Sequence, residues 1–298
     1  MKLNKLTLKE RKLFNIYLAR EQHALAVYSF ANIYIWRVLY EISWTIMEDS
    51  LCVFFSDATG CFMYLPPLAQ EPKPAVIKQC FEVMDRINKN KDISRIENIS
   101  QNQLAYYRTL KYLVQDKDPD YICLRSDLAQ LKGNKFKSQR AACNYFIKHN
   151  NFSYRKLKLT DHLECLKLFD AWAKARKGRS SDVLYCGLID DNYKVIKAAL
   201  VNYKQLNLEG LVIKIDKKIV AFSFGYKLNK NTFCILYEIT DLLIKGLAQF
   251  IFRQFCQDLK NYKYINMMDD SGLENLRKVK LSYKPNRLEP AYIVIRNS

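Results

Sequence analysis

The stretch YINMMDDSGLENLRKVKLSYKP, residues 264–285, is the most informative part of the sequence for predicting the fold. An apolar run ends there in two neighbouring carboxylates, Asp269 and Asp270. The pattern predicts a strand that delivers both acids to a helix opening at Ser271-Gly272. Because the free N–H groups in the first turn of a helix favour negative charge, the acids suit that position.

The same helix carries three charged residues at spacings of three: Glu274, Arg277 and Lys280. This spacing places the three side chains near one another on the helix surface. Acids at the start of the helix and cations further along it are consistent with a polar site. They are equally consistent with an ordinary capped helix whose cations pair with Glu274.

Together with the upstream stretch YICLRSDLAQLKGNKFKSQRAACNYF, residues 121–146, this segment resembles the phosphatidylglycerol lysyltransferase C-terminal-like family. That family consists of tandem GNAT-fold proteins and includes the catalytic domains of aminoacyl-phosphatidylglycerol synthases. The order of elements between the two motifs fits as well, so the resemblance covers most of the chain. It implies an acyl or aminoacyl transferase, in which Asp269 and Asp270 orient the amino group of the transferred moiety.

Length and composition predict a globular protein with two packed domains. The chain has 298 residues, of which 49% are hydrophobic and 13% aromatic. Lys and Arg outnumber Asp and Glu by 48 to 30, which gives a net charge of +18 and a pI near 9.4. This balance favours an anionic partner, which is nucleic acid, a phosphate-bearing cofactor or an anionic membrane surface.

The cysteines and histidines form no metal or redox motif. The nine cysteines lie singly, the closest pair being Cys52 and Cys61, so we predict buried free thiols and no metal site. The three histidines share no motif, and none is placed in the site. The start of the sequence reads as a charged helix without a signal peptide, which predicts a cytoplasmic protein, either free or peripheral to a membrane. The most apolar stretch, residues 24–40, is too short and too polar to span a bilayer.

The first half of the sequence predicts one order of helices and strands. Apolar residues at helical spacing from Leu6 to about Gln22 predict an opening helix, which Thr7 caps. Three strands, a helix, a strand, a helix and a strand follow. They are YEISWTIMED, LCVFFSD, CFMYLPPL, PAVIKQCFEVMDRINKN, SRIENIS, QNQLAYYRTLKYLVQ and YICLRS.

The second half repeats this order. It predicts a strand, two helices, three strands, a helix, a strand, a helix and a final strand. They are SYRKLK, LTDHLECLKLFDAWAKARK, DDNYKVIKAALVNYKQL, LEGLVIKID, KKIVAFSFGYKL, NTFCILYEITD, IKGLAQFIFRQFCQDLKN, YKYINMMDD, SGLENLRKVKL and AYIVIRN.

The duplicated order predicts an α+β fold in two domains, residues 1–150 and 151–298, each a mixed, mostly antiparallel sheet flanked by helices. The family resemblance identifies both as GNAT-like (acyl-CoA N-acyltransferase) domains. A pair of α+β domains of another kind is the alternative. We expect the halves to meet near residues 148–155.

In a GNAT-like domain the phosphates of the acyl donor lie over the N-terminus of the helix that follows the third strand. In the second half this junction is ITDLLIKGLAQF, in which Lys245 and Gly246 are the candidate donor-binding residues. In the first half it is LPPLAQEPKPAV, which has no glycine and several prolines. Because proline removes N–H donors, we expect a degenerate donor site in residues 1–150 and the donor site in residues 151–298. The single glycine of the second junction weakens a coenzyme A assignment and leaves room for another activated donor.

Acyl transfer requires a group that removes a proton from the nucleophile and groups that stabilise the oxyanion. Glu238 and Asp241 leave the strand ILYEITD beside the expected donor site, and Glu238 is the first candidate for the general base. The alternative for Glu238 is a solvated or ion-paired strand residue. Arg277 and Lys280 are candidates for contacting a phosphate or the oxyanion, with Lys280 assigned to donor binding.

A basic run lies near the expected domain junction. From Leu128 through Thr160 there is no acidic residue. Within the helix KFKSQRAACNYFIKHN, cations and one amide share a face, while Phe136, Cys143 and Ile147 share another. The candidate anion-binding residues are Lys132, Lys135, Lys137, Arg140, Asn144 and Lys148. A second cluster, KARKGR at residues 174–179, extends this basic surface. The run binds either an RNA backbone or anionic lipid, or it is a solvated basic face.

Three functions remain open at this point. The first is transfer of an aminoacyl group from charged tRNA to an amine or hydroxyl acceptor, of which a lipid head group is one. The second is an acyl-CoA-dependent N-acyltransferase. The third is a non-catalytic module that binds RNA or a membrane surface. None requires a cofactor beyond the co-substrate, which is aminoacyl-tRNA or acyl-CoA, and the pattern does not set an oligomeric state.

Overall fold

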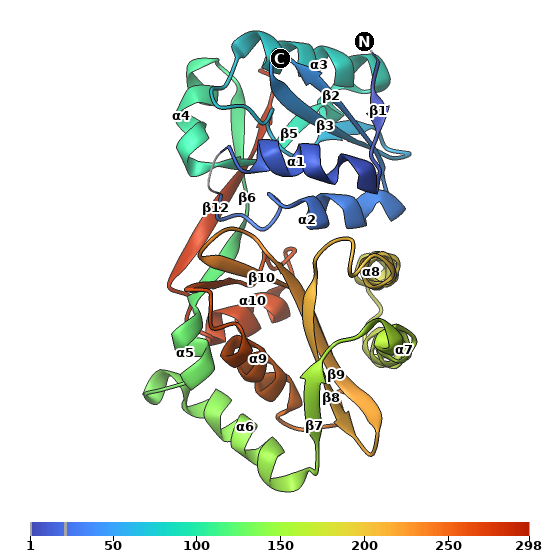
Figure 1. Cartoon of the computed structure of the whole chain (residues 1–298). Coiled ribbons are helices and arrows are strands. Elements are labelled where there is room, and N and C mark those ends of the chain that lie inside the picture. Colours follow the sequence, from blue (N-terminus) through green and yellow to red (C-terminus); the bar gives the residue numbers. More distant parts are fainter. Residues whose placement is uncertain (1, 21–22, 298) are drawn as a thin grey trace. The chain divides into compact units, whose positions relative to one another are not determined.

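The computed structural model describes residues 2–20 and 23–297 and divides the chain into two compact units. Unit 1 comprises Met1–Asp120, Asp269–Gly272 and Leu288–Ser298, and unit 2 comprises Tyr121–Met268 and Leu273–Arg287. Each is a mostly antiparallel sheet covered by helices, which confirms the predicted α+β class (Figure 1). No helix in the described ranges combines the length and the apolar character needed to cross a membrane.

Unit 1 follows the predicted order of strands and helices. Its elements are β1 (Asn4–Lys5), η1 (Leu8–Glu10), α1 (Arg11–Leu18), α2 (Phe30–Ile35), η2 (Trp36–Val38), β2 (Glu41–Met47), β3 (Ser50–Ser56), β4 (Cys61–Met63), α3 (Pro74–Ile87), η3 (Lys91–Ile93), β5 (Arg95–Ser100) and α4 (Gln101–Thr109). Strand β6 (Leu113–Leu124) begins here and ends in unit 2.

Strand β3 lies at the centre of the unit 1 core. Six consecutive residues of this strand are buried, because helices cover both faces of the sheet. On one face α3 packs against the sheet. On the other, Phe14 of α1 contacts Phe30 and Trp44 edge to face. The chain enters α1 through a capping box formed by Thr7 and Glu10, as predicted for Thr7.

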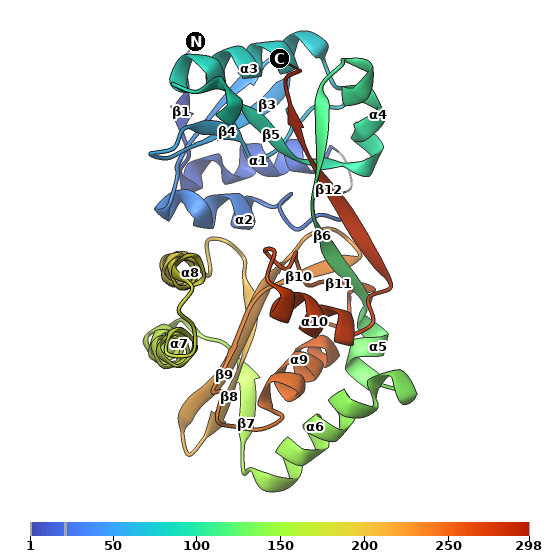
Figure 2. The ribbon, with the colours of Figure 1, turned by 180° about the vertical axis from the view of Figure 1, so that it is seen from behind.

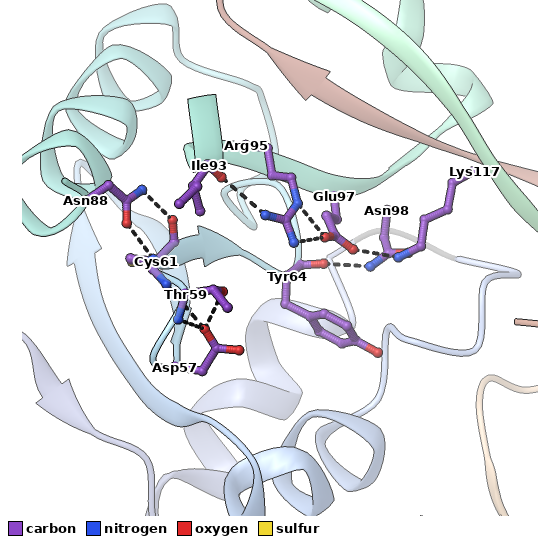
Figure 3. A network of polar contacts seen from close by, with 11 residues as sticks. Asp57, Thr59, Cys61, Tyr64, Asn88, Ile93, Arg95, Glu97, Asn98 and Lys117 are labelled. Atoms are coloured by element: carbon purple, nitrogen blue, oxygen red, sulfur yellow. Dashed lines mark hydrogen bonds and ion pairs between the residues drawn. The ribbon is translucent and has the colours of Figure 1, made fainter. Parts of the chain in front are cut away.

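A partly buried ionic network surrounds Glu97 of β5 in unit 1 (Figure 3). Glu97 pairs with Arg95 at 2.7 Å and with Lys117 at 2.6 Å. Burial alone would raise the pKa of Glu97, but the two cations outweigh it and lower that pKa. Lys117 also donates to Asn98, whose amide in turn donates to the carbonyl of Tyr64 at 2.8 Å. The network therefore connects β5 to β6 and to the segment after β4.

Unit 2 contains α5 (Arg125–Gln130), η4 (Asn134–Phe136), α6 (Lys137–His149), β7 (Ser153–Lys156), η5 (Leu159–Asp161), α7 (His162–Lys177), α8 (Val183–Val201), β8 (Glu209–Ile215), β9 (Lys218–Lys227), β10 (Thr232–Thr240), α9 (Leu247–Asp258), β11 (Tyr264–Asn266) and α10 (Glu274–Ser282). Strand β12 (Arg287–Ile295) follows and ends in unit 1. Figures 1 and 2 show α7 and α8 on one face of the β8–β10 sheet and α9 on the other. Helices α5 and α6 pack with α9 in the same core.

The last strand of each repeat is exchanged between the units, which is why the observed division of the chain differs from the predicted 1–150 and 151–298. The end of β6 pairs antiparallel with β11 of unit 2, through Ile122 to Leu124. Strand β12 pairs antiparallel with β5 of unit 1, through Ala291 to Ile295. Helix α6 consequently belongs to unit 2, and the C-terminal segment Leu288–Ser298 belongs to unit 1.

Several element ends also differ from the prediction. Helix α4 stops at Thr109 because Lys111 has a left-handed φ of 62°, and the predicted helical residues up to Gln115 belong partly to β6. The opening helix α1 ends at Leu18, and the predicted end near Gln22 lies outside the described residues.

Helix α10 begins at Glu274 and not at Ser271-Gly272. Ser271 and Gly272 have φ values of 53° and 70°, which an α-helix excludes, so the acids precede the helix in a tight turn. In α6 the buried face includes Cys143 as predicted, but Phe146 fills it where Ile147 was expected, and Ile147 is exposed.

Candidate functional site

Strand β10 is bulged at the point where it parts from β11. It pairs in parallel with β11 only from Thr232 to Cys234. Its antiparallel pairing with β9 shifts register between Ile235 and Tyr237 and then continues to Thr240. A bulge re-aims the side chains that follow it, and such bulges are common beside active sites. The second half of β10 therefore presents its residues along an edge that β11 leaves unpaired.

Gly225 of β9 makes the bulge possible. It lies opposite Ile235, and a Cβ atom placed on it would meet the carbonyl oxygen of Cys234 at 1.9 Å. No side chain fits between the two backbones at that distance. Close approach of β9 to β10 at the bulge thus depends on the absence of a side chain at this position.

Glu238 lies just beyond the bulge and faces Ser223 across the strand pair. Its Oε2 atom is buried and has no hydrogen-bond partner among the described residues, and the same is true of the Ser223 hydroxyl. Buried polar atoms in proteins are nearly always paired, because leaving one unpaired costs about 1–3 kcal/mol. Directly opposed residues share one face of a sheet, so the two unpaired groups stand side by side.

Burial raises the pKa of Glu238 to about 8. The carboxyl also lies close enough to Tyr283 and Cys256 for its charge to act on them. Burial is the largest cause that raises both pKa values; Glu238 comes next for Tyr283, and for Cys256 it follows Cys123. A carboxyl that titrates near neutral pH can both accept and return a proton during a reaction. Glu238 is thus the one predicted acid whose described surroundings suit proton transfer.

The loop after β10 is held by contacts to its own backbone and to α6. The carboxylate of Asp241 accepts the N–H of Leu243 at 2.9 Å, so it organises the loop. Gly246 caps α9 with a φ of 83°, and a Cβ atom there would meet the carbonyl oxygen of Ala142 in α6 at 2.1 Å. The Lys245 ammonium lies 4.6 Å from the ring centre of Tyr145. These contacts tie the loop to α6.

Asp269 and Asp270 belong to unit 1, whereas Glu238 and Asp241 belong to unit 2. Asp269 accepts hydrogen bonds from the N–H and hydroxyl of Ser271, at 2.9 and 3.2 Å. Asp270 is buried and accepts the N–H of Gly272 at 3.1 Å. The pKa of Tyr64 is raised well above its usual value by burial and then by the charge of Asp269, which places this acid close to Tyr64.

The predicted cations of α10 have different environments. Arg277 is exposed. Lys280 is buried, and its ammonium donates to the carbonyls of Met267 at 2.7 Å and Met268 at 3.2 Å, so it stabilises the turn after β11. The ion pair of this helix joins the predicted acid Glu274 to Lys278, at 3.4 Å, and uses neither of the predicted cations.

The candidate anion-binding residues of the α5–α6 region divide into two groups. Exposed side chains of Lys132, Lys137, Asn144 and Lys148 are directed to solvent. Arg140 instead donates to the carbonyls of Leu131 and Gly133 and so closes the end of α5. Lys135 pairs with Asp127 at 2.6 Å.

Two functional candidates, Ser223 and Gly225, were not found from the sequence. A glycine inside a strand pattern can indicate a bulge or a close backbone approach, so Gly225 carried a usable signal. Ser223 carried none, because a serine in a strand becomes notable only when its partner across the sheet is known.

Comparisons with known proteins agree with this architecture. A family model described as "Phosphatidylglycerol lysyltransferase, C-terminal" matches residues 19–295. Among curated protein sequences, none matches the chain. A conserved protein of unknown function from Bacteroides thetaiotaomicron is 27% identical, with a TM-score of 0.89 over 100% of both chains.

Two further solved structures are similar in fold. The C-terminal domain of a putative lysylphosphatidylglycerol synthetase from Agrobacterium fabrum has a TM-score of 0.68 and 14% identity, over 98% of this chain and 93% of that one. A tandem GNAT protein from the clavulanic acid biosynthesis pathway has a TM-score of 0.51 and 6% identity, over 100% of this chain and 99% of that one. The tandem GNAT-like fold predicted from the sequence is thereby confirmed.

Proposed function

Because the chain belongs to the phosphatidylglycerol lysyltransferase C-terminal family, we propose that it transfers an aminoacyl group from charged tRNA to an amine or hydroxyl acceptor such as a lipid head group. The observation that carries the proposal is the buried, unpaired Oε2 atom of Glu238 beside the bulge of β10, in a carboxyl with a pKa of about 8. It is a proton acceptor matched to neutral pH.

In the proposed reaction the acceptor's oxygen or nitrogen attacks the aminoacyl carbonyl carbon and gives its proton to Glu238. A new ester or amide bond forms, and the bond from that carbon to the 3′-terminal ribose oxygen of the tRNA breaks. That oxygen takes the proton, which leaves a tRNA hydroxyl and restores the carboxylate. The Ser223 hydroxyl, unpaired on the same face of the sheet, supplies a hydrogen bond to the reacting groups.

Other roles in the proposal follow the family resemblance. Asp269 and Asp270 bind the amino group of the aminoacyl moiety, and exposed Arg277 contacts a phosphate. The loops that border the site are held by three residues, each of which contacts a group within unit 2. They are Asp241, which accepts the N–H of Leu243, Lys245, which lies over the ring of Tyr145, and Lys280, which donates to the carbonyl of Met267.

The contacts of the α9 junction favour this donor over coenzyme A. A donor pyrophosphate is bound by free N–H groups of an open loop at a helix start. Here Asp241 takes one N–H of the loop, and the carbonyl of Ala142 lies against Gly246. The Asp241 carboxylate and the Ala142 carbonyl oxygen therefore place negative charge at the helix start, where the phosphates of coenzyme A would lie.

Donor identity can be read from thermal protection of the purified protein. A ligand at 100 times its Kd adds about 2.7 kcal/mol to the free energy of unfolding, which raises the melting temperature by several degrees. We expect aminoacyl-tRNA to give this rise and coenzyme A to give none. Protection by coenzyme A alone would identify an acyl-CoA N-acyltransferase, and protection by tRNA without turnover would identify a binding module.

The exposed cations of α6 should contribute to tRNA affinity, unlike Arg140. Lys137→Ala and Lys148→Ala should each shrink the slope of log affinity against log salt by about one. Arg140→Ala should mainly lower the free energy of unfolding, by about 1–2 kcal/mol, because two carbonyls lose a charged donor. Binding titrations at several salt concentrations, with urea unfolding as the control, separate the two effects. Slopes equal to that of the wild type in Lys137→Ala and Lys148→Ala would show that α6 does not contact tRNA.

A further inference from the structure

The turn between α7 and α8 forms a concave basic site that the proposed reaction does not use. A pocket of about 280 Å³ opens there, lined by Arg176, Arg179, Ser180, Tyr185 and Asn275. Its walls come from the end of α7, the connection to α8, the first turn of α8 and the start of α10, all within unit 2.

One N–H group of the Arg176 guanidinium lacks a hydrogen-bond partner among the described residues. Its Nε atom is buried and donates to no acceptor among the described residues. The Arg176 Cζ atom lies 5.5 Å from the ring centre of Trp172, a contact that orients the planar group. Arginine presents its N–H groups in a fixed fork that matches a phosphate or carboxylate, so a bound anion would satisfy the buried donor.

The surrounding charge is positive. From Ala171 to Ser181 the chain has four cations and no acid. Lys177 pairs with Asp190, while the carboxylate of Asp182 is engaged by the N–H groups of Leu184 and Tyr185 at the start of α8. Arg176 and Arg179 take part in no ion pair within the described chain, so they remain available to an anion.

Two large aliphatic side chains stand in solvent beside this pocket. Val183 is 82% exposed and Leu184 is 80% exposed, at the first turn of α8. A nucleic-acid backbone offers phosphate but nothing apolar to cover these side chains. An anionic phospholipid surface offers both, because the phosphate layer lies directly above the acyl boundary.

We propose that the α7–α8 turn docks the protein on an anionic phospholipid surface. Arg176 and Arg179 hold a lipid phosphate in the pocket, and Val183 and Leu184 enter the boundary between head groups and acyl chains. The proposal deepens the proposed function, on which it rests for its biological meaning, because it assigns the acceptor to the membrane surface.

Vesicle co-sedimentation tests the proposal without any need for turnover. Wild-type protein should bind vesicles containing phosphatidylglycerol and bind pure phosphatidylcholine vesicles far less. Each cation near the surface contributes about fivefold to affinity, so Arg176→Gln with Arg179→Gln should weaken binding about 25-fold. Val183→Ser with Leu184→Ser should weaken it at least about tenfold.

Matched controls lie at the other end of α8. Val201 is 60% exposed and Lys197 is exposed, so Val201→Ser and Lys197→Gln change an aliphatic side chain and a cation away from the pocket. Both should leave vesicle binding unchanged. The altered side chains at positions 183, 184 and 201 are exposed, so urea unfolding should show native stability in those variants.

The outcomes are distinct. Equal binding by pocket variants and controls would overturn the docking proposal. Loss of tRNA binding without loss of vesicle binding would assign the pocket to RNA and overturn it as well. Competition by millimolar inorganic phosphate without any preference for lipid would reduce the pocket to a free-phosphate site. Vesicle binding that follows the prediction in a protein without transfer activity would support docking and contradict the proposed function.

Discussion

Replacing Glu238 by glutamine should lower the rate of aminoacyl transfer by about tenfold to ten-thousandfold, because the variant keeps the shape of the side chain and loses its ability to accept a proton. The effect should fall on kcat more than on KM. Single-turnover transfer from charged tRNA measures it. Glu209→Gln, at an exposed glutamate of β8, is the matched control and should leave the rate unchanged.

The pH dependence of stability gives an independent reading of the same residue. Folding raises the pKa of Glu238 from 4.5 to about 8, so between these pH values the folded protein holds a proton that the unfolded chain has lost. The free energy of unfolding contributed by this group therefore falls as pH rises from about 4.5 to 8. Glu238→Gln removes that fall and should be at least as stable as the wild type at pH 8. A variant that is inactive because it unfolds would show that Glu238 is structural.

Gly246→Ala should lower the free energy of unfolding by about 2–4 kcal/mol. The residue has a left-handed φ of 83°, which costs an alanine about 1 kcal/mol, and the added Cβ would lie 2.1 Å from the carbonyl of Ala142. Relieving that clash requires α6 to move from the α9 junction, and overpacking of this kind costs about 1–3 kcal/mol. Urea unfolding of the variant measures the loss.

Gly187 provides the control for this substitution. It lies inside α8, and a Cβ atom there meets nothing within 4 Å. Gly187→Ala should therefore stabilise the protein by about 0.5–1 kcal/mol through helix propensity. If the two alanine variants had the same stability, α6 would not be packed against Gly246, and the argument against a coenzyme A loop would fail with it.

Sequence periodicity predicted the order of elements because each helix or strand is encoded by its own residues. The duplication, and with it the tandem fold, followed from that order. The division into units did not, because it depends on β6 pairing with β11 and β12 pairing with β5. The hydrophobic pattern of a strand does not indicate which distant strand it pairs with.

The candidate site divides along similar lines. Glu238 could be predicted because it leaves its strand beside the donor site expected from the family resemblance. The roles of Arg140 and Lys280 could not, since the groups they contact are backbone carbonyls, which every residue possesses. The start of α10 was misplaced because Ser271 and Gly272 adopt left-handed conformations, which a serine rarely does.

Direct transfer of a labelled amino acid tests the central claim. The protein would be mixed with tRNA charged with a labelled amino-acid mixture and with phosphatidylglycerol vesicles, and the label in the lipid phase would be followed over time. We predict that label leaves the tRNA and enters the lipid with wild-type protein, and that Glu238→Gln slows this transfer. Label that stays on the tRNA with wild-type protein, while acetyl-CoA supplies an acyl group to an added amine, would contradict the account.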